Sequence, residues 1–391
     1  MDGVKINPLL LQWARQRAGL SNEQLAKKVG LAQKPEVVRA WEAGSAHPTF
    51  RQTQALARAL RISLGYLFLS APPTTALPVT DFRTLPEAER GKFSPELEDV
   101  LNDALRKHDW LREWRTQEGA TPLPFVGRFV AGDTPEKIAQ DIRQVLDLPI
   151  PPARDAKSWN EHLRLLVRNA EEAGIIVLQS GFALSDTHRT LSVKEFRGFA
   201  LTDEYAPLVF INARDSVAGR IFTLAHELGH LWTGTSGISN PTLEPTMSPG
   251  TGSIERLCNQ VAAELLVPGE LLTQRWGRQP NTLEIAQELA KQFRVSVFVI
   301  LIRAYEVNLL PWESVQSAYA QAQQEAREFA PESERGGGDF YRTLRNRNGR
   351  LLMQEIITAL RQGSLLYQGA ARLLNIHPQT LETVLQQRLT G

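Results

Sequence analysis

Apolar residues recur at helical spacing along most of the chain, and three short segments interrupt that spacing. These segments, 175–182, 196–203 and 207–213, are rich in β-branched or aromatic residues and bounded by turn formers, so they predict strands. Helical spacing predicts helices within residues 7–69 and at 94–115, 134–148, 158–174, 217–232, 254–268 and 282–293. The pattern predicts an α+β fold that is predominantly α, with a small three-stranded sheet.

Turn-forming residues divide this pattern into segments. Residues 71–82 contain three prolines and predict a linker, and the Gly/Pro/Ser/Thr-rich stretch 234–253 predicts a loop. The expected organisation runs from an all-α domain of five short helices, through a linker and a helical connector, to a domain with the sheet and a helical C-terminal region. The corresponding boundaries are 1–70, 71–93, 94–150, 151–275 and 276–391.

Composition and charge narrow the class of protein. The chain is 42% hydrophobic and 22% charged, as expected of globular protein, and it lacks an apolar run long enough to span a membrane. The first residues lack the pattern of a secretory signal, and the single Cys258 suits a reducing compartment, so we expect a cytoplasmic protein without membrane partners.

Charge is spread unevenly, because residues 1–70 carry ten Lys/Arg and four Asp/Glu whereas the whole chain has a net charge of only +1. A basic small domain is typical of nucleic-acid binding, although an ordinary solvated surface accounts for it equally well.

The stretch "TLAHELGHLW" carries the clearest chemical signal. His226 and His230 are four residues apart and share one face of the predicted helix, so both imidazoles can reach one ion. Glu227, one residue round from the first histidine, is placed to act as the general base of a zinc hydrolase.

A catalytic zinc ion needs a third protein ligand, and the next predicted helix offers one. Glu255 follows His230 by 25 residues, and Asn259 lies one turn further on, where it can orient a ligand histidine. Glu264 is the alternative third ligand, but it sits in the apolar run "AAELL". Glu255 can also be explained as a solvated glutamate at a helix start.

These motifs carry a resemblance. "LAHELGHLW" followed by "ERLCNQVAAELLVP" resembles the ImmA/IrrE family of bacterial and phage zinc metallopeptidases over residues 155–270. The resemblance implies a zincin-like domain in which His226, His230 and Glu255 bind Zn2+ and Glu227 is catalytic. Family members cleave repressors that control phage-like elements or stress genes.

A tetrahedral intermediate also needs a donor that stabilises its oxyanion. His188 and Tyr205 are candidates for this role, and a loop histidine and a strand-end tyrosine without catalytic function are the alternatives.

Residues 7–69 resemble the XRE/Cro-like helix-turn-helix domain in "AGLSNEQLAKKVG", "VVRAWEAGSAHPT" and "LARALRISLGYLF". Ser21 and Gln24 form a capping box that opens the second helix, and Gly30 ends it. The resemblance implies a second helix at Asn22–Val29 and a recognition helix at Pro35–Ala43.

Contacts to DNA follow from the same resemblance. The residues nearest base edges would be Lys34, Glu36 and Arg39, and the residues nearest phosphates would be Asn22, Ser45, Thr49 and Arg51. Ten residues separate Gly30 from Trp41, however, where the family usually has eight. The extra pair falls near Gln33 and Lys34, so base contacts stay open and the domain could instead dock a protein.

The C-terminal region holds two weaker patterns. Arg342, Arg345, Arg347 and Arg350, together with Tyr341, form a basic cluster that could contact nucleic acid or an acidic partner, or could be a solvated face. "AARLLNIHPQTLETVL" has a faint helix-turn-helix pattern.

Two functions remain open. The first is a DNA-binding transcriptional regulator that also acts as a zinc endopeptidase on a specific repressor or regulatory protein. The second is an antitoxin that represses its own operon and binds a toxin, with proteolysis secondary or absent. The expected partners are a double-stranded DNA operator and a protein substrate or cognate toxin. The resemblance also allows a homodimer, because such DNA-binding domains commonly read two half-sites.

Overall fold

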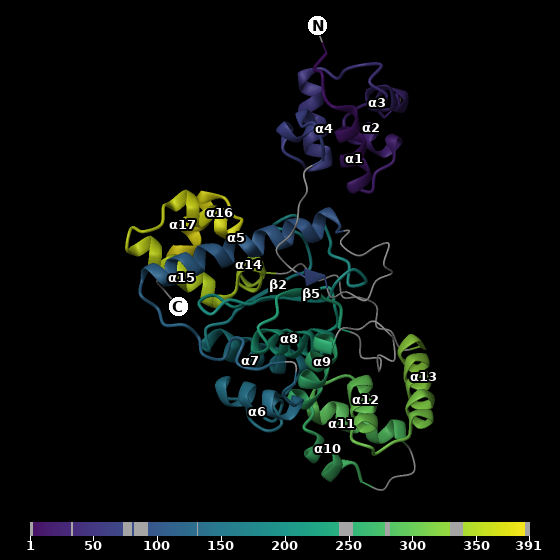
Figure 1. Ribbon diagram of the computed structural model, residues 1–391, viewed down its shortest axis with the longest axis vertical. Coiled ribbons are helices and arrows are strands. Elements are labelled where there is room, and N and C mark those ends of the chain that lie inside the picture. The colour runs from purple at the N-terminus through teal and green to yellow at the C-terminus, as the bar shows by residue number, and fades with distance from the viewer. Residues whose placement is uncertain are drawn as a thin grey trace. The chain divides into compact units, whose positions relative to one another are not determined.

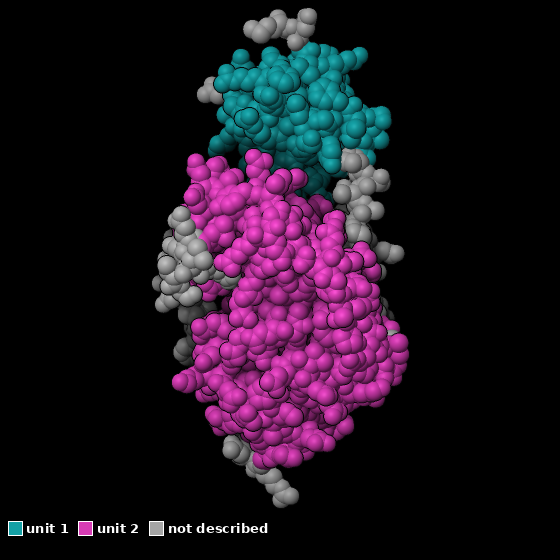
Figure 2. Space-filling model, turned by 90° about the vertical axis from the view of Figure 1, so that its left-hand side faces the viewer, with its two compact units in different colours: residues 1–78, 92–99 teal, residues 79–91, 100–391 magenta. Residues whose placement is uncertain are grey.

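A computed structural model describes residues 3–32, 34–72, 80–81, 93–130, 132–241, 253–277, 282–328 and 339–387. The chain forms two compact units (Figure 2). The first contains residues 1–78 and 92–99, and the second contains residues 79–91 and 100–391.

The first unit is all helical, as expected. Its elements are α1 (Pro8–Arg17), α2 (Asn22–Lys28), α3 (Pro35–Glu42), α4 (Phe50–Leu60) and the 3-10 helix η1 (Leu64–Phe68). The predicted capping box opens α2, because the Ser21 hydroxyl accepts from the backbone N–H of Gln24 at 3.2 Å. Leu11, Leu25, Trp41 and Leu56 are among the apolar side chains that close its core.

Five strands build the sheet of the second unit. They are β1 (Thr80–Asp81), β2 (Ile176–Ser180), β3 (Gly198–Leu201), β4 (Leu208–Asn212) and β5 (Gly237–Ser239), in the order β1-β5-β3-β4-β2. β3 is antiparallel to β4 and β5, whereas β2 pairs with β4 and β1 with β5 in parallel.

The prediction of three strands was therefore wrong in number. β5 lies inside the stretch predicted as the loop 234–253, and β1 lies inside the predicted linker 71–93. Both strands are very short, and they are ordered by backbone pairing with neighbours that are distant in sequence. An apolar alternation cannot reveal such strands. Residues 242–252 of that predicted loop lie outside the described residues.

Helices enclose the sheet on both faces (Figure 1). α7 (Trp159–Glu172) and α8 (Val217–Trp232) pack against β2, β3 and β4. Successive residues of a strand face opposite sides. Val177 and Val209 accordingly join the core shared with these helices, whereas Leu178 and Phe210 meet α5 (Pro95–Gln117) on the other face. The predicted cap of α5 is present, because the Ser94 hydroxyl accepts from Leu97 N–H at 3.1 Å.

The remaining helices surround this centre, and no described helix is long and apolar enough to cross a membrane. α9 (Ser253–Leu266) and α6 (Pro135–Val145) pack beside α8. They are followed by α10 (Gly269–Arg275), α11 (Thr282–Phe293), α12 (Val297–Glu306), α13 (Trp312–Glu328), α14 (Phe340–Asn348), α15 (Arg350–Arg361), α16 (Tyr367–Leu374) and α17 (Pro378–Gln387). The helical C-terminal region is thus confirmed.

Candidate metal centre

Helix α8 places the two histidines in the interior of the second unit. The Ser216 hydroxyl caps the helix by accepting from Gly219 N–H at 3.0 Å. From Ile221 to Trp232 every side chain is buried, so this segment is covered on all sides by its neighbours. Polar side chains at His226 and His230 therefore need partners inside the protein.

The three expected metal ligands come together. The Nε2 atoms of His226 and His230 are 3.0 Å apart. Glu255, from α9, places its Oε1 2.9 Å from His230 Nε2 and its Oε2 3.4 Å from His226 Nε2. Among the described residues, these three form the group of His, Cys, Asp and Glu side chains arranged to hold a metal ion, with ligand atoms within 4.8 Å of one another.

Outer hydrogen bonds orient both rings. His226 Nδ1 lies 2.9 Å from Asn259 Oδ1, and His230 Nδ1 lies 2.9 Å from Thr235 Oγ1. An amide oxygen accepts, so Nδ1 of His226 carries the proton and its Nε2 presents a lone pair. The Thr235 hydroxyl can accept in the same way. Two Nε2 lone pairs beside a carboxylate fit a divalent cation with a nitrogen and oxygen ligand set, such as zinc.

Glu227 is buried next to this cluster, and only one of its two carboxylate oxygens has a hydrogen-bond partner among the described residues. Its Oε1 accepts a hydrogen bond from the Ser239 hydroxyl on β5, whereas its Oε2 is buried without a hydrogen-bond partner among the described residues. Burial raises the pKa of Glu227 to about 8, while His226 and Ser239 act in the opposite direction. The carboxylate therefore has one oxygen held by the sheet and one oxygen available.

Two glycines let other elements approach the cluster closely. A Cβ on Gly198 in β3 would lie 2.6 Å from Thr223 Cγ2 and 2.8 Å from Glu227 Oε1. A Cβ on Gly229 would lie 3.3 Å from the Cα, Cβ and Sγ of Cys258 on α9. Sequence reasoning missed Gly198 and Ser239, because nothing in the spacing of either residue points to the histidine helix.

Other candidates at this centre are placed elsewhere. Glu264 forms an ion pair with Arg303 and accepts from Gly269 N–H at 3.1 Å, so Glu255 and not Glu264 joins the histidines. Burial raises the pKa of the Cys258 thiol well above its usual value, which keeps the thiol protonated.

Neither oxyanion candidate is joined to the cluster by a described contact. His188 is exposed in the segment between β2 and β3, where its backbone N–H donates to the Asp186 carboxylate at 3.0 Å. Tyr205 lies in the turn that follows Leu201, at the opposite end of β3 from Gly198.

The predicted DNA-contact residues lie on the first unit. Asn22 is half-buried, and the other six are exposed: Lys34, Glu36, Arg39, Ser45, Thr49 and Arg51.

Several of these residues have partners within the first unit. Arg39 forms a 2.5 Å ion pair with Glu23, and the Asn22 amide donates to Glu42 Oε2 at 3.3 Å. Thr49 caps α4, and Ser45 donates to Ala40 O. Gln33 lies outside the described residues. The contacts of these residues with DNA stay predictions.

The C-terminal arginines do not form one surface. Arg347 is buried and donates to the carbonyl oxygens of Leu374 and Asn375 at 3.1 and 3.3 Å. Arg350 pairs with Glu172 at 3.2 Å. The prediction of one basic cluster is therefore wrong, since only Arg342 and Arg345 are exposed.

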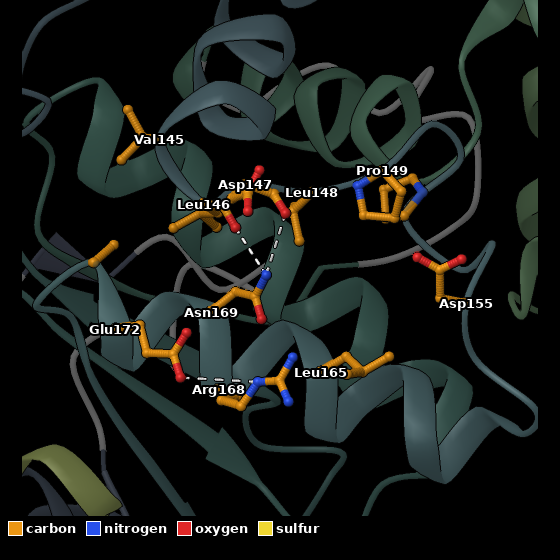
Figure 3. Close-up of a pocket in the computed structure, with 12 residues that line it drawn as sticks. Val145, Leu146, Asp147, Leu148, Pro149, Asp155, Leu165, Arg168, Asn169 and Glu172 are labelled. Carbon is orange, nitrogen blue, oxygen red and sulfur yellow. Dashed lines mark hydrogen bonds and ion pairs between the residues drawn. The ribbon is translucent and has the colours of Figure 1, made fainter.

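A cavity of about 370 Å³ lies between the end of α6 and α7 (Figure 3). Leu146, Leu148 and Leu165 line it together with Arg168, which pairs with Glu172 at 3.9 Å. His226, His230 and Glu255 are not part of its lining, so this cavity is separate from the histidine cluster.

The fold and the site together define a helical unit joined to an α+β unit with a buried group of side chains that could hold a metal ion. The family comparisons specify both parts. Residues 11–67 match the helix-turn-helix family model, and residues 170–305 match the peptidase family described as the IrrE N-terminal-like domain. The chain thus joins an XRE-type helix-turn-helix domain to an ImmA/IrrE-like peptidase domain. No curated protein matches the chain.

Proposed function

We propose that the chain is a zinc endopeptidase that cleaves a specific repressor or regulatory protein and that binds an operator on double-stranded DNA through its first unit. The family matches support a DNA-binding segment and a peptidase segment. One observation carries the finer assignment: two histidine Nε2 atoms and a buried carboxylate converge beside a second carboxylate with an available oxygen.

His226, His230 and Glu255 would hold the ion, and Asn259 and Thr235 would fix the two rings through their Nδ1 atoms. Zinc bound there would lower the pKa of a water ligand toward about 7 and polarise a peptide carbonyl. Three protein ligands leave a fourth position open for that water, as catalytic zinc requires.

Glu227 would move the proton. The Ser239 hydroxyl holds Oε1 of its carboxylate, so Oε2 can accept a proton from water and pass it to the leaving amine. Burial favours the neutral form of this carboxyl group and therefore makes the ionised form a stronger base. A purely structural metal site has no use for such a group.

The first test is the zinc content of the purified full chain and of two variants. We expect about one zinc per chain in the wild type, as one three-ligand site implies. His226→Ala should lose the zinc, whereas Glu227→Gln should keep it. Glu270→Gln, an exposed glutamate on α10, is the matched control and should behave as the wild type.

The second readout is cleavage of the proteins encoded beside this gene. Wild type and Glu270→Gln should cut one of them, and His226→Ala and Glu227→Gln should not. Cleavage that survives in Glu227→Gln would overturn the catalytic role of that residue. If zinc binds and no neighbour is cut, but one forms a stable complex with the chain, the antitoxin function replaces the peptidase.

A further inference from the structure

The last two helices form a compact pair that has no role in the functions proposed above. α16 (Tyr367–Leu374) and α17 (Pro378–Gln387) are joined by three residues. Asn375 in that turn is left-handed, with φ 52° and ψ 47°, and the N–H of Ile376 donates to Ala371 O at 3.0 Å. A three-residue turn between two short helices is the length found in helix-turn-helix motifs.

The two helices bury their apolar side chains and leave one face of α17 exposed. Ala370, Ala371 and Leu374 on α16 and Leu381 and Val384 on α17 are buried. α16 packs against α15 as well as against α17. Helix α15 in turn packs on β2 and α7, so it attaches the pair to the second unit.

The outward face of α17 is built from groups suited to base edges. Gln379, Glu382 and Thr383 are exposed, at the i, i+3 and i+4 spacing of a single face. Amide, carboxylate and hydroxyl groups are among the side-chain groups that read base edges in the major groove. Threonine is a poor helix former, so helix stability does not account for its place on an exposed helical surface.

The charge of the C-terminal helices also favours DNA binding. Residues 339–387 contain six arginines against one aspartate and two glutamates. Arg347 is buried, and Arg350 is half-buried and paired with Glu172, whereas the other four arginines are exposed: Arg342, Arg345, Arg361 and Arg372. An excess of exposed arginine attracts a polyanion such as the DNA backbone.

We propose that α16 and α17 form a second helix-turn-helix unit, which binds double-stranded DNA with α17 as its recognition helix. Gln379 and Thr383 would face base edges, and Arg361 and Arg372 would contact phosphates. The inference does not depend on the peptidase activity, and it adds a second DNA contact to the one proposed for the first unit.

Local DNA cleavage by a tethered reagent tests the placement directly. The single native cysteine, Cys258, is buried, so an introduced surface cysteine is the accessible thiol. An iron–EDTA conjugate on Thr383→Cys, in the full chain bound to duplex DNA, should cut the DNA backbone near the conjugate. The same conjugate on Ser45→Cys reports DNA at the first unit, and on Arg164→Cys, exposed on α7, it should give no cuts.

Charge reversal provides the second measurement. Arg361→Glu with Arg372→Glu should weaken binding to a duplex about tenfold or more at low salt. The slope of log affinity against log salt should fall by about 2, since two phosphate contacts are lost. Arg164→Glu, the matched control, should change neither quantity.

Thermal melting of each variant shows whether it is folded. If the charge-reversed chain is folded and binds DNA as the wild type does, and Thr383→Cys gives no cuts where Ser45→Cys does, the second DNA site does not exist. If neither conjugate cuts the DNA, both proposed DNA sites are wrong. Zinc binding and peptidase activity are measured separately in the wild type, so failure here leaves them untouched.

Discussion

The two units differ in what they bury. Among the described residues of the first unit, Thr53 is the one buried polar side chain, and the remaining core is apolar. The second unit buries ionisable groups at the candidate metal centre and elsewhere, including Lys107, His162 and Arg347. A buried charge must be paired, neutralised or bound to a metal, whereas a surface charge costs little. Substitutions of charged side chains should therefore have large effects on stability in the second unit and small effects in the first.

The largest expected effect on stability is at Asp103. Its carboxylate accepts from Lys107 Nζ at 2.7 Å, and the Lys107 side chain is fully buried. Asp103→Ala would leave this ammonium group unpaired, so we expect a loss of about 3–5 kcal/mol in the free energy of unfolding. Chemical denaturation measures this loss. Glu113→Ala, exposed on the same helix, should change stability by less than about 0.5 kcal/mol.

A double variant separates charge from packing. Asp103→Leu with Lys107→Met removes both charges and keeps apolar volume, so it should recover much of the stability lost in Asp103→Ala. If the single variant is as stable as the wild type, Lys107 is not held in the folded chain by this carboxylate.

The next effect is acid sensitivity of the second unit through His162. Burial lowers the pKa of His162 to about 4, below its usual value in the unfolded chain. Between these two values the unfolded chain binds the extra proton, so stability falls as pH drops from about 6.5 to about 4. The loss amounts to about 3 kcal/mol at roughly 1.4 kcal/mol per pKa unit.

Denaturation at several pH values compares wild type with His162→Leu and with His188→Leu, the exposed control. His162→Leu should flatten the pH dependence by that amount, and His188→Leu should leave it unchanged. Identical profiles for all three chains would show that His162 is not held neutral in the folded state.

Zinc affinity should respond more moderately at Asn259, which contacts the proposed ligand His226 and is not itself a proposed ligand. Loss of such an orienting hydrogen bond typically weakens metal binding about 10- to 100-fold, so we expect this for Asn259→Ala in a competition titration with a chelator. Gln260→Ala, its neighbour on α9, should bind zinc as the wild type does. Equal affinities for the two variants would mean that Asn259 does not orient His226.

The same contrast explains how much the sequence could predict. Helical spacing placed His226, His230 and Glu255 on two helices, because the i, i+4 relation and the capping signals are local. Ser239 and Gly198 escaped prediction because they reach Glu227 through strand pairing between residues far apart in the chain. The arginine cluster was predicted wrongly for a related reason. Arg347 lies on α14 and Arg350 on α15, and the burial of each is set by neighbours that are distant in the chain.

The smallest effect on stability is expected on the surface of the first unit. Arg39 pairs with Glu23, and both side chains are more than half exposed, at 65% and 55%. Such a pair is worth less than about 1 kcal/mol, so the melting curve of Arg39→Ala should nearly overlay that of the wild type. If Arg39 makes the proposed base contact, affinity for the proposed operator should nevertheless fall about tenfold, because such a contact is worth about 1–3 kcal/mol. Arg58→Ala, at an exposed arginine on α4, controls for the loss of charge alone.

If both variants weaken DNA binding equally, Arg39 acts only through its charge. If neither variant weakens it, α3 does not carry the DNA contact.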